Sequence, residues 1–171
     1  MAKTDSFFIR ATVNAGDSLT FTEETIDLGA YVDALGKSVL RIHNIAVQYS
    51  DSAGRTPNID GDASAACDFQ LTTQSQTDMV LAGTNKSVIS AGRLTAVNRE
   101  TGAGVPSIVT DALDVAPQHW TQGYLVAVEQ IYLGGIASSG WNEDVYVSLV
   151  MECTSETLTK EAALALALSQ Q

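Results

Sequence analysis

The sequence predicts an all-β protein, an antiparallel two-sheet sandwich with a short C-terminal helix. Three observations support this prediction. Apolar and polar residues alternate in many short segments, and loops rich in Gly or Ser separate those segments. No amphipathic helix connects one segment to the next, as a parallel βαβ fold would require. A chain of 171 residues has the length of one domain, and the seven or eight strands that we expect favour a sandwich.

The first two strands are predicted at residues 6–13 and 18–28. In each segment the apolar residues recur at every second position, and the residues between them are mostly polar. Both segments are therefore expected to be half-buried strands with one side towards the core. The apolar positions are Phe7, Ile9, Ala11 and Val13 in the first segment and Leu19 and Phe21 in the second.

The segment 38–49 is apolar in both phases of a strand. Leu40 and Ile42 share one phase, whereas Ile45 and the apolar residues after it fall in the other. One extra residue near His43 and Asn44 would bring both sets to the same side. We therefore predict a β-bulge at this point.

A long loop and four further strands follow. Residues 50–65 are rich in Ser, Asp, Gly and Asn, which is typical of a loop. The segments 67–73 and 86–98 are predicted strands, and Gly92 marks a bulge in the second. The region 123–153 predicts two strands joined by a loop at 134–144, as a hairpin. A helical turn is considered near 74–83 or 109–120.

A helix is predicted over Lys160 to Gln170, so that residues 1–157 form the sandwich and 158–171 the C-terminal helical segment. The segment consists mostly of strong helix formers, and Thr159 can act as its N-cap. The alternating leucines would also fit a strand, but alanine is a poor strand former. No polar face remains, because Leu164 and Leu168 share one side and Leu166 lies roughly opposite.

This apolar helix has two interpretations. It packs wholly on its own domain, or it is held between its own domain and a neighbouring subunit. The second interpretation makes Leu164, Leu166 and Leu168 candidate assembly residues.

The composition argues against several functions. Twenty acidic and nine basic side chains give a net charge of −11, which disfavours direct binding of nucleic acid and of anionic membrane surfaces. No stretch is long and apolar enough for a membrane span, and the first residues do not have the pattern of a signal peptide. The chain is therefore expected to be made and kept in the cytoplasm. Cys67 and Cys153 are expected to be small buried residues rather than a disulfide.

Residues for catalysis are scarce. His43 and His119 belong to no catalytic or metal-binding motif, and no phosphate-binding loop is present. We therefore expect no enzymatic activity and no cofactor.

The best candidate for a metal site lies in the segment NIDGDAS. Asn58, Asp60 and Asp62 alternate like the first oxygen ligands of a calcium loop. The bidentate acid that would complete the loop is missing, because Cys67 occupies its place. Turn formation explains these residues without an ion, and calcium binding is the alternative.

A sugar-binding surface is a further alternative. Its aromatic residues would come from Trp120, Tyr124, Tyr132 and Trp141. Such residues are more often buried in a sandwich core.

The end of the chain, GYLVAVEQIYLGGIASSGWNEDVYVSLVMECTSETLTKEAALALALSQQ, resembles the single jelly-roll capsid proteins of tailless icosahedral archaeal and bacterial viruses that contain a membrane. The resemblance implies a jelly-roll subunit in a virion shell, joined to copies of itself and to other capsid proteins. An internal virion membrane would lie nearby and would separate the shell from the genome. The start MAKTDSFF is not a basic genome-packaging arm, which agrees with such a separation.

The predicted function is therefore that of a capsid subunit that self-assembles into a shell. The chain lacks catalytic motifs, has polar strand faces and ends in an apolar helix. These features suit a protein that packs against its own copies. The alternatives are a subunit of a tail tube or filament and a carbohydrate-binding sandwich module.

Overall fold

The computed structural model describes residues 4–33, 35–60, 64–99 and 108–171, with the side chain of residue 108 left out of the description. In this part of the chain nine strands are followed by one α-helix, and a short 3₁₀ helix, η1, precedes β7. The elements are β1 (Phe7–Gly16), β2 (Thr22–Asp27), β3 (Ser38–Ser50), β4 (Ser64–Thr72), β5 (Val88–Val97), β6 (Ile108–Val115), η1 (Pro117–His119), β7 (Tyr124–Val126), β8 (Gln130–Ala137), β9 (Val145–Thr157) and α1 (Lys160–Ser169).

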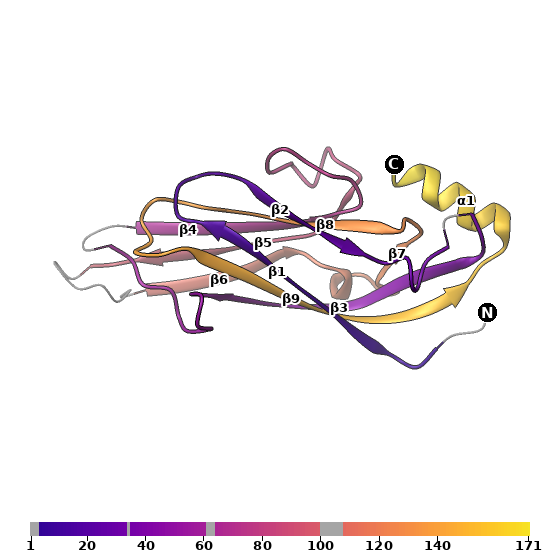
Figure 1. Cartoon of the computed structure of the whole chain (residues 1–171), viewed down its shortest axis with the longest axis horizontal. Coiled ribbons are helices and arrows are strands. Elements are labelled where there is room, and N and C mark those ends of the chain that lie inside the picture. The colour runs from indigo at the N-terminus through magenta and orange to yellow at the C-terminus, as the bar shows by residue number, and fades with distance from the viewer. Residues whose placement is uncertain (1–3, 34, 61–63, 100–107) are drawn as a thin grey trace.

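The strands form two antiparallel sheets that face each other (Figure 1). One sheet has the order β1-β9-β3-β7, and the other has the order β2-β8-β4-β5-β6. If β6 is set aside as an added edge strand, the first strand pairs with the last, the second with the second-last, and so on to β4 and β5. This nested pairing defines a jelly roll, a long hairpin rolled into two sheets. The predicted fold class is confirmed.

The core lies between the sheets and is lined by the inward side of each strand. In β9 every second residue from Val145 to Met151 is buried, as the alternation predicts. Cys67 and Cys153 are also buried and are not joined in a disulfide. Burial raises the pKa of each thiol to about 12, so both act as small apolar residues of the core.

Both predicted bulges are present. The register of β3 against β9 shifts between Ile42 and Asn44, which brings Ile42 and Ile45 to the same buried side. The register of β5 against β6 shifts between Ala91 and Gly92. A Cβ atom at Gly92 would lie 2.6 Å from the ring of Phe69, so glycine lets this core ring pack against the strand.

The predicted hairpin at 123–153 is wrong. The strands β8 and β9 follow each other in the chain but belong to opposite sheets. Each is paired on both sides by strands that are distant in sequence, β2 and β4 for β8 and β1 and β3 for β9. The alternation located both strands correctly, but it carries no information about which strands pair.

Three other details differ from the prediction. Leu19 does not face the core, because it lies in a turn with a φ of 56° and is exposed, and β2 begins only at Thr22. The region 109–120 contains most of strand β6, and its helical part is limited to η1. The extra strand raises the count from the expected seven or eight to nine.

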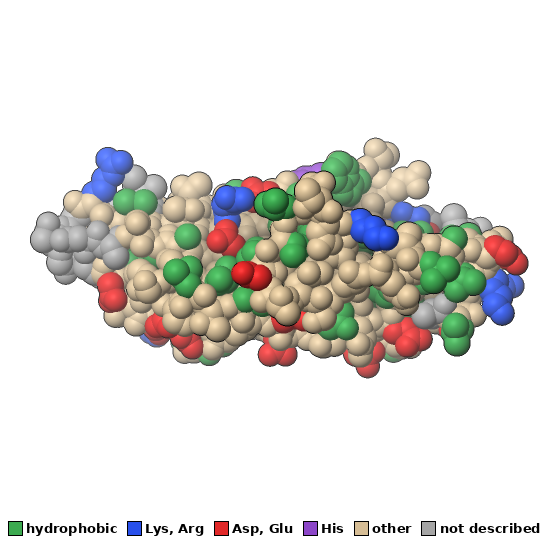
Figure 2. Space-filling view, turned by 90° about the horizontal axis from the view of Figure 1, so that it is seen from above, with side chains coloured by type: hydrophobic (Ala, Val, Ile, Leu, Met, Phe, Trp, Pro, Cys, Tyr) green, Lys and Arg blue, Asp and Glu red, His purple; other side chains and the backbone are tan. Residues whose placement is uncertain are grey.

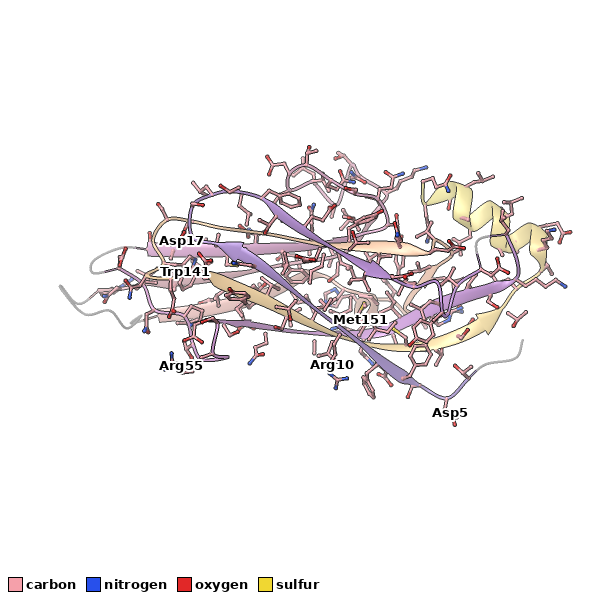
Figure 3. All side chains as sticks on the ribbon, in the orientation of Figure 1. Asp5, Arg10, Asp17, Arg55, Trp141 and Met151 are labelled. Atoms are coloured by element: carbon pink, nitrogen blue, oxygen red, sulfur yellow. The ribbon has the colours of Figure 1, made fainter. Side chains whose placement is uncertain are left out.

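The two ends of the sandwich carry different structures (Figure 1). The helix end carries α1, the turn after β2 and the start of β1. The loop end carries the β1–β2 turn, the described part of the β3–β4 loop and the β8–β9 connection. Asp17, Arg55 and Trp141 mark the loop end in Figure 3.

Candidate assembly surface

The helix α1 follows β9 almost directly and packs back on the sandwich. Thr159 is its N-cap, and the Thr159 side chain accepts a hydrogen bond of 3.3 Å from the backbone N–H of Ala162. Ala163 and Ala167 are buried on one side of the helix. Together with Val39 and Ala127 they form a second, smaller hydrophobic cluster. The small alanines let the helix lie close to the ends of β3 and β7.

Gln170 fixes the end of the helix. Its Oε1 accepts a hydrogen bond from the backbone N–H of Ala127 at 2.9 Å, and its Nε2 donates to the carbonyl of Leu125 at 2.6 Å. Its own carbonyl accepts a hydrogen bond of 2.9 Å from the hydroxyl of Thr73, which follows β4 in the other sheet. One buried residue therefore connects α1 to both sheets.

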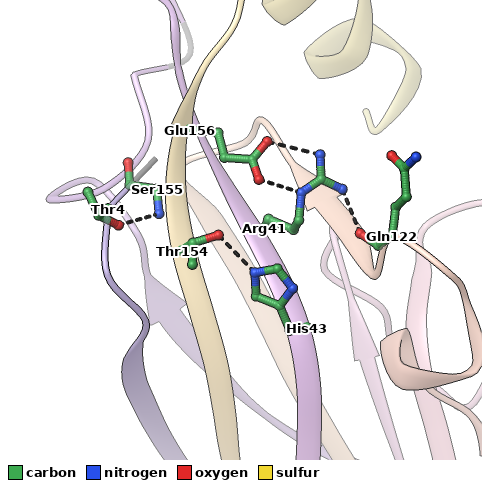
Figure 4. Close-up of polar contacts among 7 residues, drawn as sticks. All are labelled: Thr4, Arg41, His43, Gln122, Thr154, Ser155 and Glu156. Atoms are coloured by element: carbon green, nitrogen blue, oxygen red, sulfur yellow. Dashed lines mark hydrogen bonds and ion pairs between the residues drawn. The ribbon is translucent and has the colours of Figure 1, made fainter. Parts of the chain in front are cut away.

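A buried ion pair lies close to the helix (Figure 4). The Nε and Nη2 atoms of Arg41 donate to the two carboxylate oxygens of Glu156 at 2.5 and 2.9 Å. The side chain of Glu156 is 0% exposed and that of Arg41 is 11% exposed. The Nη1 atom of Arg41 also donates to the carbonyl of Gln122 at 2.6 Å. This arrangement joins β3, β9 and the segment before β7.

The structure divides the three candidate leucines. Leu166 is half-buried and packs on the sandwich with the small cluster. Leu164 and Leu168 are 44% and 61% exposed on the outer side of the helix. Leu35, which is 81% exposed, lies in the turn that leads to Lys37, and the carbonyl of Lys37 accepts a hydrogen bond from the N–H of Leu158.

We call Leu164 and Leu168, which lie one helical turn apart on α1, the leucine patch. Figure 2 shows hydrophobic side chains at this end of the molecule, among charged ones. Because α1 is anchored at both its ends, the outer side of the helix has a fixed shape. A fixed apolar surface is suited to docking against another protein surface. The interface role of the three helix leucines stays a prediction.

The predicted calcium ligands are only partly described. Asn58 and Asp60 are exposed, and Asp62 lies outside the described residues. The carbonyl of Asn58 accepts a hydrogen bond from Asn142, and the N–H of Asp60 donates to Gly140. These bonds flank a bridge between Ile59 and Trp141. Within the described ranges, no group of three or more His, Cys, Asp or Glu residues could hold a metal ion. The calcium alternative stays a prediction.

The histidines and tryptophans take separate places. The Nε2 atom of His43 is 2.9 Å from the hydroxyl of Thr154, within the outer face of the β1-β9-β3-β7 sheet. His119 is exposed at the end of η1. Trp141 is buried and donates a hydrogen bond of 3.0 Å to the carbonyl of Ala66, whereas Trp120 is 55% exposed. The two tryptophans therefore do not form one aromatic surface.

Sequence reasoning missed the glutamines that bind backbone groups of other segments. Gln170 is one, and Gln70 makes the same kind of contact on the β4–β5 loop. Its Nε2 donates to the carbonyl of Asp78 at 3.1 Å, and its Oε1 accepts from the N–H of Val80 at 2.9 Å. Gln70 falls in the polar phase of DFQLTT, between the inward Phe69 and Leu71, so nothing in the alternation indicates its burial. No pattern identifies the partners.

The comparisons with known proteins concern the fold. The chain matches no family model, and a search of curated proteins finds no match either. Among solved structures, Cocksfoot mottle virus is 7% identical, with 95% of this chain and 99% of that chain covered and a TM-score of 0.40. Merkel cell polyomavirus VP1 is 6% identical, with 89% and 96% covered and a TM-score of 0.40.

A third solved structure does not come from a virus. PorU from Porphyromonas gingivalis is 8% identical and has a TM-score of 0.39, with 91% of this chain and 13% of that chain covered. At these identities and TM-scores the likenesses carry no argument about function. The jelly-roll assignment rests on the strand pairing itself. Within the described part of the chain, no helix has the length and apolar character needed to cross a membrane.

Proposed function

We propose that this protein is a virion structural protein, a capsid subunit that assembles with copies of itself into a closed shell. The observation that carries the proposal is the leucine patch. Leu164 and Leu168 are exposed on a helix whose position is fixed by Gln170 and Thr73. A neighbouring copy would cover them.

The free energy of covering these side chains favours assembly. Full burial of one leucine stabilises a contact by roughly 1.5–3 kcal/mol. A shell repeats the same contact in every copy, so a modest interface suffices for a large particle. A contact between two different surfaces produces rings where the rotation closes, and shells combine several such contacts.

The finer parts of the proposal follow from the charge and from the family resemblance. The net charge of −11 favours a subunit that does not contact the genome directly. A shell around an internal membrane, as in tailless archaeal or bacterial viruses, would allow this. The chain would be made in the host cytoplasm and would end in the virion beside its own copies and other capsid proteins.

The test is the double substitution Leu164→Glu and Leu168→Glu. Both side chains are exposed, so the sandwich should remain folded, as measured by circular dichroism. We expect the wild type to form large particles in light scattering and in negative-stain images, and the double variant to form none. Unchanged particles in the double variant would contradict the proposal.

The matched control is Leu81→Glu. Leu81 is an exposed leucine on the β4–β5 loop rather than on α1, and its substitution should leave assembly intact. The images also decide the symmetry. Images of open tubes or filaments would support a tail-tube or filament subunit in place of a capsid subunit.

A further inference from the structure

Each sheet of the sandwich ends in two edge strands. The edges are β1 and β7 in one sheet and β2 and β6 in the other. An edge strand presents unpaired N–H and C=O groups, to which a strand of another chain can pair. Proteins usually block such edges with short strands, charges or covering groups.

The β7 edge is short and covered. This strand has three residues, and the amide of Gln170 binds the carbonyl of Leu125 in β7 and the N–H of Ala127 just after it. Beyond the end of β7, β3 becomes the edge. There the amide of Gln118 binds both the N–H and the carbonyl of Ile45, at 3.0 and 2.9 Å.

The edges of the other sheet carry acids. The six residues of β2 include Glu23, Glu24 and Asp27. The strand β6 includes Asp111 and Asp114. Two such strands would repel each other where these acids meet, which disfavours pairing with a second copy.

Of these devices, the β1 edge has only one charge, that of Arg10. It is ten residues long, contains no acid and no proline, and has its only irregularity at the far end, between Asn14 and Gly16. No hydrogen bond among the described residues reaches the outer edge of Phe8–Thr12. An edge strand of this kind is suited to pairing with another strand.

The first half of β1 is also incompletely covered by its own domain. The inward residues Phe7, Ile9 and Ala11 are only half-buried, whereas Val13 and Ala15 are fully buried. A groove of about 410 Å³ lies beside this half, between β1 and β2. Phe7 stacks on Tyr31 with ring centroids 4.6 Å apart, so the open edge coincides with apolar side chains that the domain covers only in part.

We infer that β1 pairs antiparallel with β1 of a second copy, about a twofold axis through Ile9. The inference deepens the proposed function, because it names a second contact between copies that uses none of the leucine patch. A twofold contact requires a surface that complements itself. The segment FFIRA meets this requirement.

The proposed register places Phe8 opposite Arg10 of the partner subunit, and Phe7 opposite Ala11 of the partner subunit. Arg10 points away from the sandwich (Figure 3), and its guanidinium carbon is 6.0 Å from the centre of the Phe8 ring in the same chain. Pairing would thus set a cation beside an aromatic ring on both sides of the axis. A twofold axis through Arg10 would instead place the two arginines directly opposite each other, which is unfavourable.

The first test uses opposite charges at one exposed position. Phe8→Lys places a lysine opposite Arg10 of the partner subunit, twice in each dimer, and Phe8→Glu places a glutamate there. We expect the dimer dissociation constant to rise about tenfold or more for Phe8→Lys and to stay equal or fall for Phe8→Glu. Leu81→Lys is the control and should leave the dimer unchanged.

The measurement is sedimentation equilibrium on proteins that also carry Leu164→Glu and Leu168→Glu. These two substitutions remove the contact made by the leucine patch, so that only pairing through β1 can produce a dimer. The inference about β1 and the proposed role of the leucine patch can therefore fail separately. A protein that remains monomeric at high concentration overturns the inference. So does equal dissociation for the two Phe8 variants.

The second test measures the register with cysteines. Residues directly opposite each other can form a disulfide, whereas diagonal neighbours lie too far apart. We expect a mixture of the Phe8→Cys and Arg10→Cys chains to cross-link, and each variant alone to cross-link much less. The natural cysteines are buried and give little background. Equal cross-linking in all three samples overturns the register.

Discussion

The helix end and the loop end of the sandwich hold their chains in different ways. At the helix end, polar side chains join segments that are far apart in the sequence. Arg41 pairs with Glu156, and Gln170 binds the residues around β7. At the loop end, Asp51 binds residues of its own turn, the N–H groups of Ala53 and Arg55 and the Arg55 side chain. The loop end also has contacts between distant segments, such as the hydrogen bond from the Trp141 indole to the carbonyl of Ala66.

The exposed leucines are also unevenly divided between the two ends. Leu35, Leu164 and Leu168 lie at the helix end, whereas Leu19 is the exposed large hydrophobic residue in the described turns of the loop end. Contacts between distant segments fix the relative position of several elements, and a docking surface needs such a fixed shape. The turn around Asp51 is fixed by its own residues, and such a loop is tolerant of change. At the helix end, contacts between distant segments hold a helix that exposes two leucines, whereas the turn around Asp51 exposes none.

The largest difference between the ends should appear when an ion pair is broken at each. Glu156→Gln removes one charge of the buried pair and leaves the guanidinium of Arg41 without a counter-charge. The loss of a partner from a buried pair costs about 3–5 kcal/mol of unfolding free energy. Arg55→Gln breaks the pair of the loop end, but Arg55 is 77% exposed. We expect its effect to be small.

Urea denaturation of both variants measures these free energies. The wild type and the Arg55→Gln variant should unfold at similar midpoints, well above the midpoint of Glu156→Gln. Equal losses in the two variants would remove the energetic difference between the ends.

A smaller effect is expected from Gln170→Ala. The substitution leaves the N–H of Ala127 and the carbonyl of Leu125 without a partner at a buried place. Such groups cost about 1–3 kcal/mol, so we expect a loss of about 2 kcal/mol and a loosened α1. Hydrogen exchange should accelerate in α1 and β7 and stay unchanged in the β3–β4 loop.

The control for this variant is its neighbour. Gln171→Ala changes an exposed glutamine next to the same contact and should alter neither stability nor exchange. Accelerated exchange at both ends of the sandwich in Gln170→Ala would show that the helix end is not an independent unit.

The same division explains what the sequence could and could not predict. Alternation located β1, β4 and β9, and the change of phase at His43 located a bulge, because burial on one side of a strand leaves a mark in adjacent residues. The pairing of strands is not reflected in the pattern of adjacent residues. The predicted hairpin was therefore wrong. Leu164 and Leu166 could be assigned to different sides of a helix from spacing alone.

The contacts that hold the helix end belong to the unpredicted part. A glutamine that binds backbone groups can do so anywhere in the fold, because every residue offers a carbonyl and nearly every residue an N–H. Neither Gln170 nor Gln118 therefore has a local signature. The Arg41–Glu156 pair joins two strands whose adjacency is a property of the jelly roll, and it could not be identified before the topology was known.

The smallest predicted effect is a change of stability at acidic pH, and it concerns the loop end alone. The pKa of Asp51 lies below its usual value of 3.8, chiefly because the backbone N–H of Arg55 donates to the carboxylate, with further help from Ala53 and from the Arg55 guanidinium. A carboxyl group whose pKa is lowered by folding contributes stability that is present above its unfolded pKa and disappears as the pH falls through the folded pKa. Asp51→Asn should therefore be less stable than the wild type at pH 7, and the difference should shrink below about pH 4. Thermal unfolding at a series of pH values measures this difference in stability between Asp51→Asn and the wild type. A difference that stays constant down to about pH 2 would mean that the charge of Asp51 does not stabilise the turn.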